Sequence, residues 1–122
     1  MIRTQGLTHI HLVVRDLERS LRLYQGVFGM EERFRSGPRR VFLNTPGTSD
    51  LVTLNEDPEE AQLAGVNGGV AHFGFRLEKP SDLDAAIEEV EGAGGRLLRR
   101  GEHAPGVAFA YVVDPDGYVI EI

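Results

Sequence analysis

Hydrophobic and polar residues alternate along eight short runs that are rich in β-branched and aromatic side chains. This alternation, interrupted by Gly, Pro and Asp turns, predicts strands rather than helices. The strands are expected at residues 7–14, 31–35, 40–45, 50–55, 69–77, 95–100, 107–113 and 118–122. In the first of these, His9, His11 and Val13 share one face, and Ile10, Leu12 and Val14 share the other.

Two further stretches carry their apolar residues at helical spacing. Residues 17–28 follow Asp16, which can cap the helix, and precede Gly29, which can close it. The second helix begins after Ser81, where Asp84 three residues on resembles a capping box, and ends at Gly92 or at residues 94–95. Each helix therefore follows one strand and precedes three.

The order of elements repeats along the chain. Residues 6–56 and 69–122 each form a βαβββ module, and the acidic, glycine-rich stretch 57–68 links them. The sequence predicts one α+β domain over residues 1–122, in which two tandem modules form a curved mixed sheet around a cleft. Superposing the modules places His9 opposite His72 and Thr53 opposite Glu121, so all four are expected to line the same surface.

The last stretch contains an acidic residue in an unusual position. Residues 108–122 form two apolar runs around an Asp-Pro-Asp-Gly turn, which predicts a β-hairpin. Glu121 lies among Tyr118, Val119, Ile120 and Ile122. A carboxylate buried there would need a cation or hydrogen-bond donors.

Two imidazoles and a carboxylate that meet in a cleft can bind a divalent transition metal and leave positions open for water or substrate. The pattern therefore makes His9, His72 and Glu121 candidate metal ligands. The alternative is that these histidines are hydrogen-bonded structural residues. A metal there would favour oxygen-rich, anionic ligands.

Composition narrows the function classes. The 122 residues carry a formal net charge of −6 with scattered basic residues, which argues against nucleic acid as a partner. No signal peptide or membrane-spanning run is recognisable, and cysteine is absent, so we expect a cytoplasmic protein without a thiolate nucleophile. The partner we expect is a small-molecule substrate.

Three stretches resemble the vicinal oxygen chelate superfamily, the glyoxalase/bleomycin resistance protein/dioxygenase group. They are residues 9–17 with Ser20, Tyr24 and Gly29, residues 72–76, and residues 114–122. The resemblance covers nearly the whole chain and implies paired βαβββ modules, a metal bound by His9, His72 and Glu121, and a substrate that chelates it through two neighbouring oxygens. It also implies a homodimer, because two-module members commonly complete the cleft across a two-fold interface.

Departures from the family patterns bear on the reaction. Glyoxalase I and the related epimerase use a second carboxylate or equivalent ligand at the end of the first module, where this chain has Thr53. A three-ligand site favours an extradiol-type dioxygenase, for which Fe²⁺ or Mn²⁺ is expected; Zn²⁺, Ni²⁺ and Co²⁺ are the other metals that such a site accepts. The alternatives are a glyoxalase-type lyase or isomerase, a fosfomycin-type thiol transferase, and a non-catalytic protein that sequesters a drug.

The dioxygenase interpretation needs an acid or base beside the metal. His11 on the first strand and His103, expected in the loop before the last hairpin, are candidate bases, and Tyr111 is a candidate hydrogen-bond donor. His11 equally suits a surface residue. Glu56 and the acidic residues up to Glu60 are expected to lie in a solvated linker.

Overall fold

The computed structural model describes residues 1–3, 5–65 and 70–122. The first module contains β1 (Ile10–Val14), α1 (Leu17–Tyr24), β2 (Glu31–Arg35), β3 (Arg40–Asn44) and β4 (Val52–Glu56). A 3₁₀ helix, η1 (Glu60–Leu63), follows in the expected linker. The second module contains β5 (Phe73–Gly74), the 3₁₀ helix η2 (Pro80–Asp82), α2 (Leu83–Gly92), β6 (Arg96–Ala104), β7 (Val107–Val113) and β8 (Val119–Glu121).

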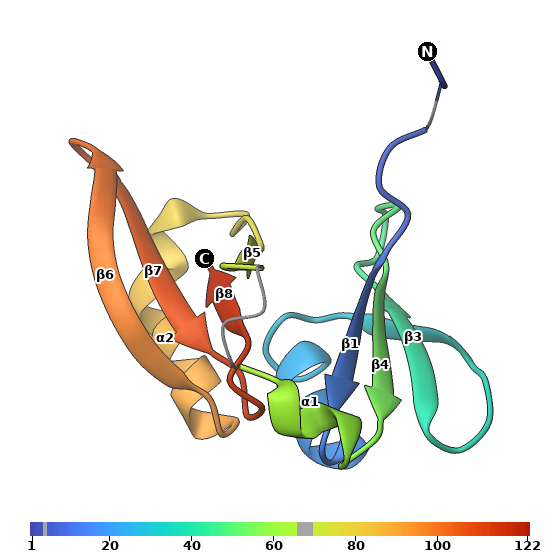
Figure 1. The fold of residues 1–122 in the computed structure, drawn as a ribbon. Coiled ribbons are helices and arrows are strands. Elements are labelled where there is room, and N and C mark those ends of the chain that lie inside the picture. The colour runs from blue at the N-terminus through green and yellow to red at the C-terminus, as the bar shows by residue number, and fades with distance from the viewer. Residues whose placement is uncertain (4, 66–69) are drawn as a thin grey trace.

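Both modules fold in the same way, which confirms the predicted repeat and the α+β class (Figure 1). The strand order is β1-β4-β3-β2 in the first sheet and β5-β8-β7-β6 in the second. In each sheet the first strand pairs in parallel with the last, and the other pairs are antiparallel. The strands form two separate four-stranded sheets, not one continuous sheet.

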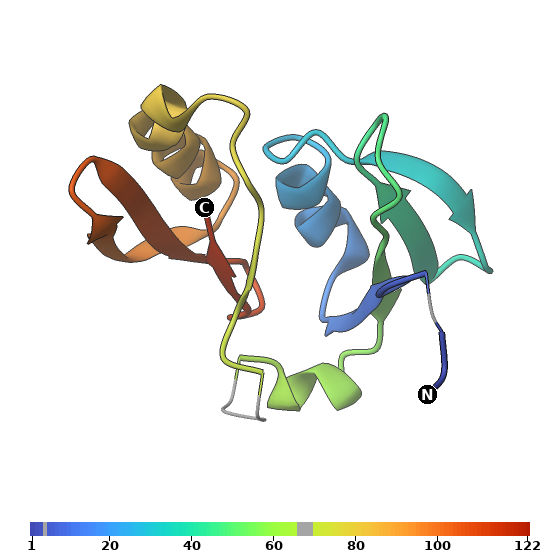
Figure 2. The same ribbon diagram turned by 90° about the horizontal axis from the view of Figure 1, so that it is seen from above.

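Each sheet has a face packed under a helix and an uncovered face. Alternate residues of β1 and β3 are buried and α1 contacts β4, whereas α2 packs on β6 and β7 in the second sheet. Seen from above, the sheets diverge from β1 and β8, and α1 and α2 lie in the angle between them (Figure 2). The uncovered faces are therefore on the outer sides of the chain. No helix in the described ranges has the length and apolar character to cross a membrane.

Helix α1 starts where the sequence predicts it. The Asp16 side chain accepts a hydrogen bond from the Arg19 N–H at 2.9 Å, which is the expected N-cap. Glu56 is the last residue of β4 and accepts a bond from the Leu17 N–H at 2.8 Å, so it anchors the helix start instead of lying in a solvated linker. The helix ends at Tyr24, four residues before the predicted end, and turns lead to Gly29, whose positive φ of 66° closes the segment.

The second module differs from expectation at three places. Strand β5 spans two residues instead of nine, because the three-residue β8 offers few pairing partners. Strand β6 continues to Ala104 and so includes His103, which the sequence placed in a loop. The Ser81 hydroxyl bonds Asp82 at 3.4 Å, and Asp82, not Ser81, is the N-cap residue of α2, without a side-chain cap bond. Residues 66–68 of the expected linker and residue 69 of the expected strand lie outside the described residues.

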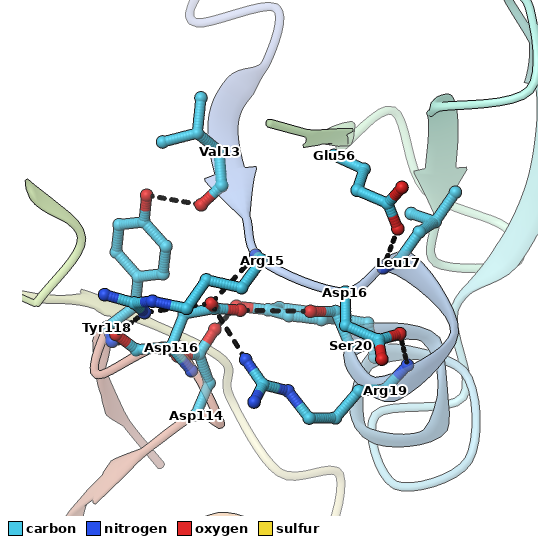
Figure 3. Close-up of polar contacts among 11 residues, drawn as sticks. Val13, Arg15, Asp16, Leu17, Arg19, Ser20, Glu56, Asp114, Asp116 and Tyr118 are labelled. Atoms are coloured by element: carbon cyan, nitrogen blue, oxygen red, sulfur yellow. Dashed lines mark hydrogen bonds and ion pairs between the residues drawn. The ribbon is translucent and has the colours of Figure 1, made fainter. Parts of the chain in front are cut away.

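Two buried carboxylates in the turn before β8 join the modules (Figure 3). Asp116 accepts hydrogen bonds from the Arg15 N–H at 3.0 Å, from the Arg15 and Arg19 guanidinium groups at 3.1 and 3.0 Å, and from the Ser20 hydroxyl at 3.2 Å. Asp114 accepts one from the Tyr24 hydroxyl at 2.8 Å. The turn thus fixes the orientation of the second sheet against the first helix.

Asp114 also organises its own turn. One of its oxygens accepts the Asp116 and Tyr118 N–H groups, both at 2.9 Å. Burial is the main reason why the pKa of this carboxyl is raised from 3.8 to about 6. Burial likewise raises the pKa of the Tyr24 hydroxyl well above its usual value, so this group stays a hydrogen-bond donor at neutral pH.

Candidate metal centre

Glu121 has two imidazole partners on the uncovered face of the second sheet. His72 Nε2 lies 3.1 Å from one carboxylate oxygen, and His103 Nε2 lies 2.6 Å from the other. The side chain of Glu121 keeps 26% of its surface exposed, so the predicted burial is only partial. The predicted need for donors is met by His72, which directly precedes β5, and by His103 on β6.

The strand register of the second sheet explains why His72 lies beside Glu121. Gly74 of β5 and Tyr111 of β7 both lie opposite Glu121, and Arg99 of β6 lies opposite Tyr111. Because side chains alternate along a strand, His72 shares the face of Gly74 and therefore that of Glu121. A Cβ atom at Gly74 would lie 3.0 Å from the Glu121 carbonyl oxygen and 3.4 Å from its Cβ, so glycine leaves room for the carboxylate.

Aromatic rings hold both imidazoles. The His72 ring meets the edge of Tyr111 with centroids 4.9 Å apart, and the His103 ring stacks on Phe109 at 4.2 Å. Phe109 lies against Gly101, where a Cβ atom would come within 2.7 Å of the ring. The predicted residues His103 and Tyr111 are thus both beside Glu121, although no contact links Tyr111 to the carboxylate directly.

Arg99 is a site residue that sequence reasoning missed. Its guanidinium carbon lies 5.1 Å from the Tyr111 ring centroid and 5.8 Å from that of Phe109, a cation–π arrangement. No ion pair joins it to an acidic side chain among the residues that the structure describes. The alternation of β6 could have placed it on this face, but a register shift between Leu97 and Arg99 obscures that pattern.

The charge balance around Glu121 favours its ionised form. The hydrogen bond from His103 is the largest cause that lowers the pKa of the Glu121 carboxyl below its usual value, and the nearby charge of His72 contributes in the same direction. An ionised carboxylate beside imidazole nitrogens provides the donor types that a transition metal takes.

The first module carries the remaining predicted residues on its own uncovered face. His9 is exposed, and its Nδ1 lies 2.8 Å from the Thr8 hydroxyl oxygen. His11 pairs with Thr53 across β1 and β4, and Thr53 pairs with Phe42 of β3. Burial, followed by the charge of Arg40, lowers the pKa of His11 below 6.5, which favours the neutral imidazole.

Thr53 takes the position equivalent to Glu121, as the repeat predicts, but its environment differs. The residue is fully buried, and its hydroxyl has no hydrogen-bond partner among the described residues. The first module therefore presents a hydroxyl where the second presents a carboxylate.

Two cavities adjoin these residues. One of about 490 Å³ lies between the modules and is lined by residues that include His11, Glu60 and His72. The other, of about 450 Å³, lies at the end of the second sheet, with Glu121 and His103 on its wall. Each volume is in the range of small-molecule sites.

The predicted ligand set is divided between the two modules. His72 and Glu121 meet, whereas no contact brings His9 to either of them within the described chain. Among the residues that the structure describes, no three His, Cys, Asp or Glu side chains are grouped so that they could hold a metal ion. Within one chain, the structure therefore brings together two of the three predicted ligands, His72 and Glu121, but not His9.

Comparison with known proteins identifies the relatives of this chain. A family model described as the Glyoxalase/Bleomycin resistance protein/Dioxygenase superfamily matches residues 6–122. A lactoylglutathione lyase of Neisseria meningitidis serogroup A is 34% identical over 94% of this chain and 87% of its own length.

Other relatives are longer proteins. The lactoylglutathione lyase GLX1 of Arabidopsis thaliana is 31% identical over 93% of this chain, which spans only 42% of that enzyme. A manganese-dependent 2,3-dihydroxybiphenyl 1,2-dioxygenase of Geobacillus genomosp. 3 is 29% identical over 93% of this chain and 35% of its own length.

Solved structures show the same architecture. The fosfomycin resistance protein FosX of Mesorhizobium loti superposes with a TM-score of 0.74 at 25% identity, over 98% of this chain and 90% of that one. With the repeated βαβββ modules, the matching family model and a relative of 34% identity, the chain belongs to the glyoxalase/bleomycin resistance protein/dioxygenase superfamily.

Proposed function

We propose that this protein is a metal-dependent enzyme that acts on a small substrate with two neighbouring oxygen atoms. The observation that carries the proposal is the meeting of His72 and His103 with the two oxygens of Glu121 on an uncovered sheet face. The nitrogen and oxygen donors fit a divalent transition metal, with Fe²⁺ or Mn²⁺ as the first candidates and Zn²⁺, Ni²⁺ or Co²⁺ as alternatives.

We infer that His72 and Glu121 hold the metal with His9 from a second copy of the chain. His9 has a free Nε2 among the described residues, because its known bond uses Nδ1. The two sheets diverge (Figure 2), and although His11 and His72 line one cavity where they converge, His9 makes no contact with His72 or Glu121 within the described residues of one chain. In a two-fold dimer, the first sheet of one copy can face the second sheet of the other, which forms two equivalent sites.

The metal, when bound, supplies Lewis acidity toward the substrate's oxygens and, if it is redox-active, a site for oxygen chemistry. This chain supplies the surrounding groups. His103 lies within hydrogen-bond distance of Glu121 and so can exchange a proton at the edge of the site. The phenol of Tyr111, beside His72, is a donor for an oxyanion, and Arg99 adds positive charge behind it.

Ring cleavage of a catechol-like substrate is our first proposal for the reaction. A neutral imidazole beside the metal ligands suits the deprotonation of a ring hydroxyl, and the phenol can donate a hydrogen bond to the oxyanion that forms. The manganese-dependent dioxygenase among the relatives supports this assignment.

A glyoxalase-type lyase or isomerase is the second candidate. The lactoylglutathione lyases of Arabidopsis thaliana and Neisseria meningitidis are 31% and 34% identical, and the match covers 87% of the Neisseria enzyme. Against it, Thr53 replaces the second carboxylate that the proton transfer of such enzymes requires, and its buried hydroxyl is a poor base.

Metal content and complementation test the site. We expect about one transition metal per chain in the purified protein and its loss in Glu121→Ala. His9→Ala and Glu121→Ala should each lose metal alone, but their mixture after subunit exchange should recover about a quarter of the wild-type content, because only mixed dimers carry one intact site. Arg22→Gln, an exposed change on α1, serves as the control. Failure of the mixture to recover metal would contradict the shared site.

The reaction is tested on the metal-loaded protein. Oxygen uptake with catechols in the Fe²⁺ or Mn²⁺ form, strongly reduced in His103→Gln, supports the dioxygenase. Conversion of a hemithioacetal in the Ni²⁺ or Zn²⁺ form, without oxygen uptake, supports the lyase. The absence of both activities in protein that retains metal would contradict both assignments. Binding of a small molecule by protein that takes up no metal and shows neither activity would instead favour a sequestering protein.

We also propose that the protein works in the cytoplasm as a homodimer. The composition without cysteine suits a reducing compartment, and the uncovered sheet faces suit a second copy. Sedimentation analysis that finds only monomer at micromolar concentration would contradict the dimer.

A further inference from the structure

The cavity at the end of the second sheet contains a cation that the proposed chemistry does not use. This cavity of about 450 Å³ is bounded by Glu121 and His103 on one side, and Arg76 contributes to its lining. Arg76 follows β5 and shares the strand face of His72 and Gly74, because every second side chain points the same way. The main-chain pairing continues to this point, since the Phe75 N–H bonds the Glu121 carbonyl at 2.9 Å.

Arg76 has no acidic partner within the described chain. The ion pairs of the structure use other arginines, and Glu121 is occupied on both oxygens by His72 and His103. In a protein with a net charge of −6, an unpaired guanidinium in a cavity is a local site for an anion.

The other walls of the cavity are apolar. The Phe109 ring, Val107, Leu77 and Ile122 line it. Phe109 is fixed from both sides, by the stacked His103 ring and by Gly101 beneath it. A compact apolar group can therefore lie against Val107, Leu77 and Ile122 while an anionic group on the same molecule meets Arg76.

We propose that this cavity binds the part of the substrate that lies beyond its two neighbouring oxygens, and that Arg76 selects substrates with a carboxylate on an aromatic or similarly compact apolar group. The inference deepens the proposed function and rests on it for the placement of the oxygen pair beside Glu121. The carboxylate preference itself depends only on Arg76 and the apolar walls.

Phenylacetate is the probe that tests the cavity without the metal, because it has a ring and a carboxylate but lacks neighbouring hydroxyls. Binding is followed in the metal-free protein by NMR shifts of the Arg76 Nε–H and of neighbouring amides. We expect Arg76→Gln to weaken binding by about tenfold, the size of a lost charge-assisted hydrogen bond. Arg22→Gln removes an equal charge from the exposed side of α1 and should leave binding unchanged.

A second experiment tests whether the cavity and the metal site bind two parts of the same substrate. In the metal-loaded protein, 3,4-dihydroxyphenylacetate should bind about tenfold more tightly than the neutral 4-methylcatechol, and Arg76→Gln should remove the difference. Gly74→Ala, which places a methyl group 3.0 Å from the Glu121 carbonyl oxygen, should weaken both catechols alike.

The outcomes separate the two proposals. Phenylacetate that binds Arg76→Gln as well as wild type, or does not bind wild type at all, overturns the assignment of Arg76. Equal affinity for the two catechols overturns it as well, while leaving the metal site intact. Phenylacetate binding that depends on Arg76, with no catechol bound in the presence of metal, supports the cavity and contradicts the proposed function.

Discussion

Replacing Asp114 with asparagine should change how stability depends on pH. In the wild type, burial raises the pKa of this carboxyl from 3.8 to about 6, so the folded state holds a proton more tightly than the unfolded chain. The stability contribution of Asp114 is therefore fully present below about pH 4 and is lost as the pH rises through 6. The rise in pKa corresponds to about 3 kcal/mol over the whole range.

Asparagine can keep the local hydrogen bonds. Its oxygen can accept from the Asp116 and Tyr118 N–H groups, as one Asp114 oxygen does now, and its amide can donate to the Tyr24 hydroxyl oxygen. Because asparagine does not ionise, the free energy of unfolding of Asp114→Asn should rise relative to that of the wild type by about 2 kcal/mol as the pH increases from about 4.5 to about 7.5.

The assay is urea unfolding of both proteins across this pH range. The difference between the two free energies of unfolding removes the contributions of the other titrating groups, which both chains share. Asp84→Asn, a change at an exposed carboxylate that pairs with Arg100, should show a nearly constant difference from wild type. A constant difference for Asp114→Asn as well would refute the reasoning that burial controls this carboxyl.

Three further substitutions test other parts of the fold. Asp116→Ala should lower the free energy of unfolding by about 3 kcal/mol, because it leaves Arg15, Arg19 and Ser20 without their shared acceptor; calorimetry that finds less than about 1 kcal/mol would contradict this role. Thr53→Val should stabilise by about 1 kcal/mol in urea unfolding, since it removes a buried hydroxyl without a partner in the described chain, and a loss of stability would show that the hydroxyl is satisfied. Gly95→Ala should destabilise by about 2 kcal/mol, since its Cβ would lie 2.6 Å from a Val113 carbonyl oxygen and a Val90 methyl; an unchanged melting temperature would refute this crowding.

The sequence by itself determined the repeat and the kind of fold. Period-2 alternation, two helical stretches and the Asp-Pro-Asp-Gly turn are local signals, and each depends on neighbouring residues in the chain. They placed Asp16 at a helix start and Glu121 on the last strand, and both positions are confirmed. The need of Glu121 for donors also followed from local chemistry, because a carboxylate among apolar residues requires a partner.

The tertiary structure decided which residues became the partners of Glu121 and on which face of the sheet they lie. Strand β6 continues to Ala104, so His103 lies on the face of Arg99 and Gly101 and reaches Glu121, and the length over which two strands pair depends on their packing, not on residue type alone. The hydrogen bonds by which Asp114 and Asp116 link the second module to α1 could not be predicted either, because the turn sequence indicates only the turn and not its distant partners. The positions of Arg76 and Arg99 in the candidate site follow from strand register, which long-range packing sets.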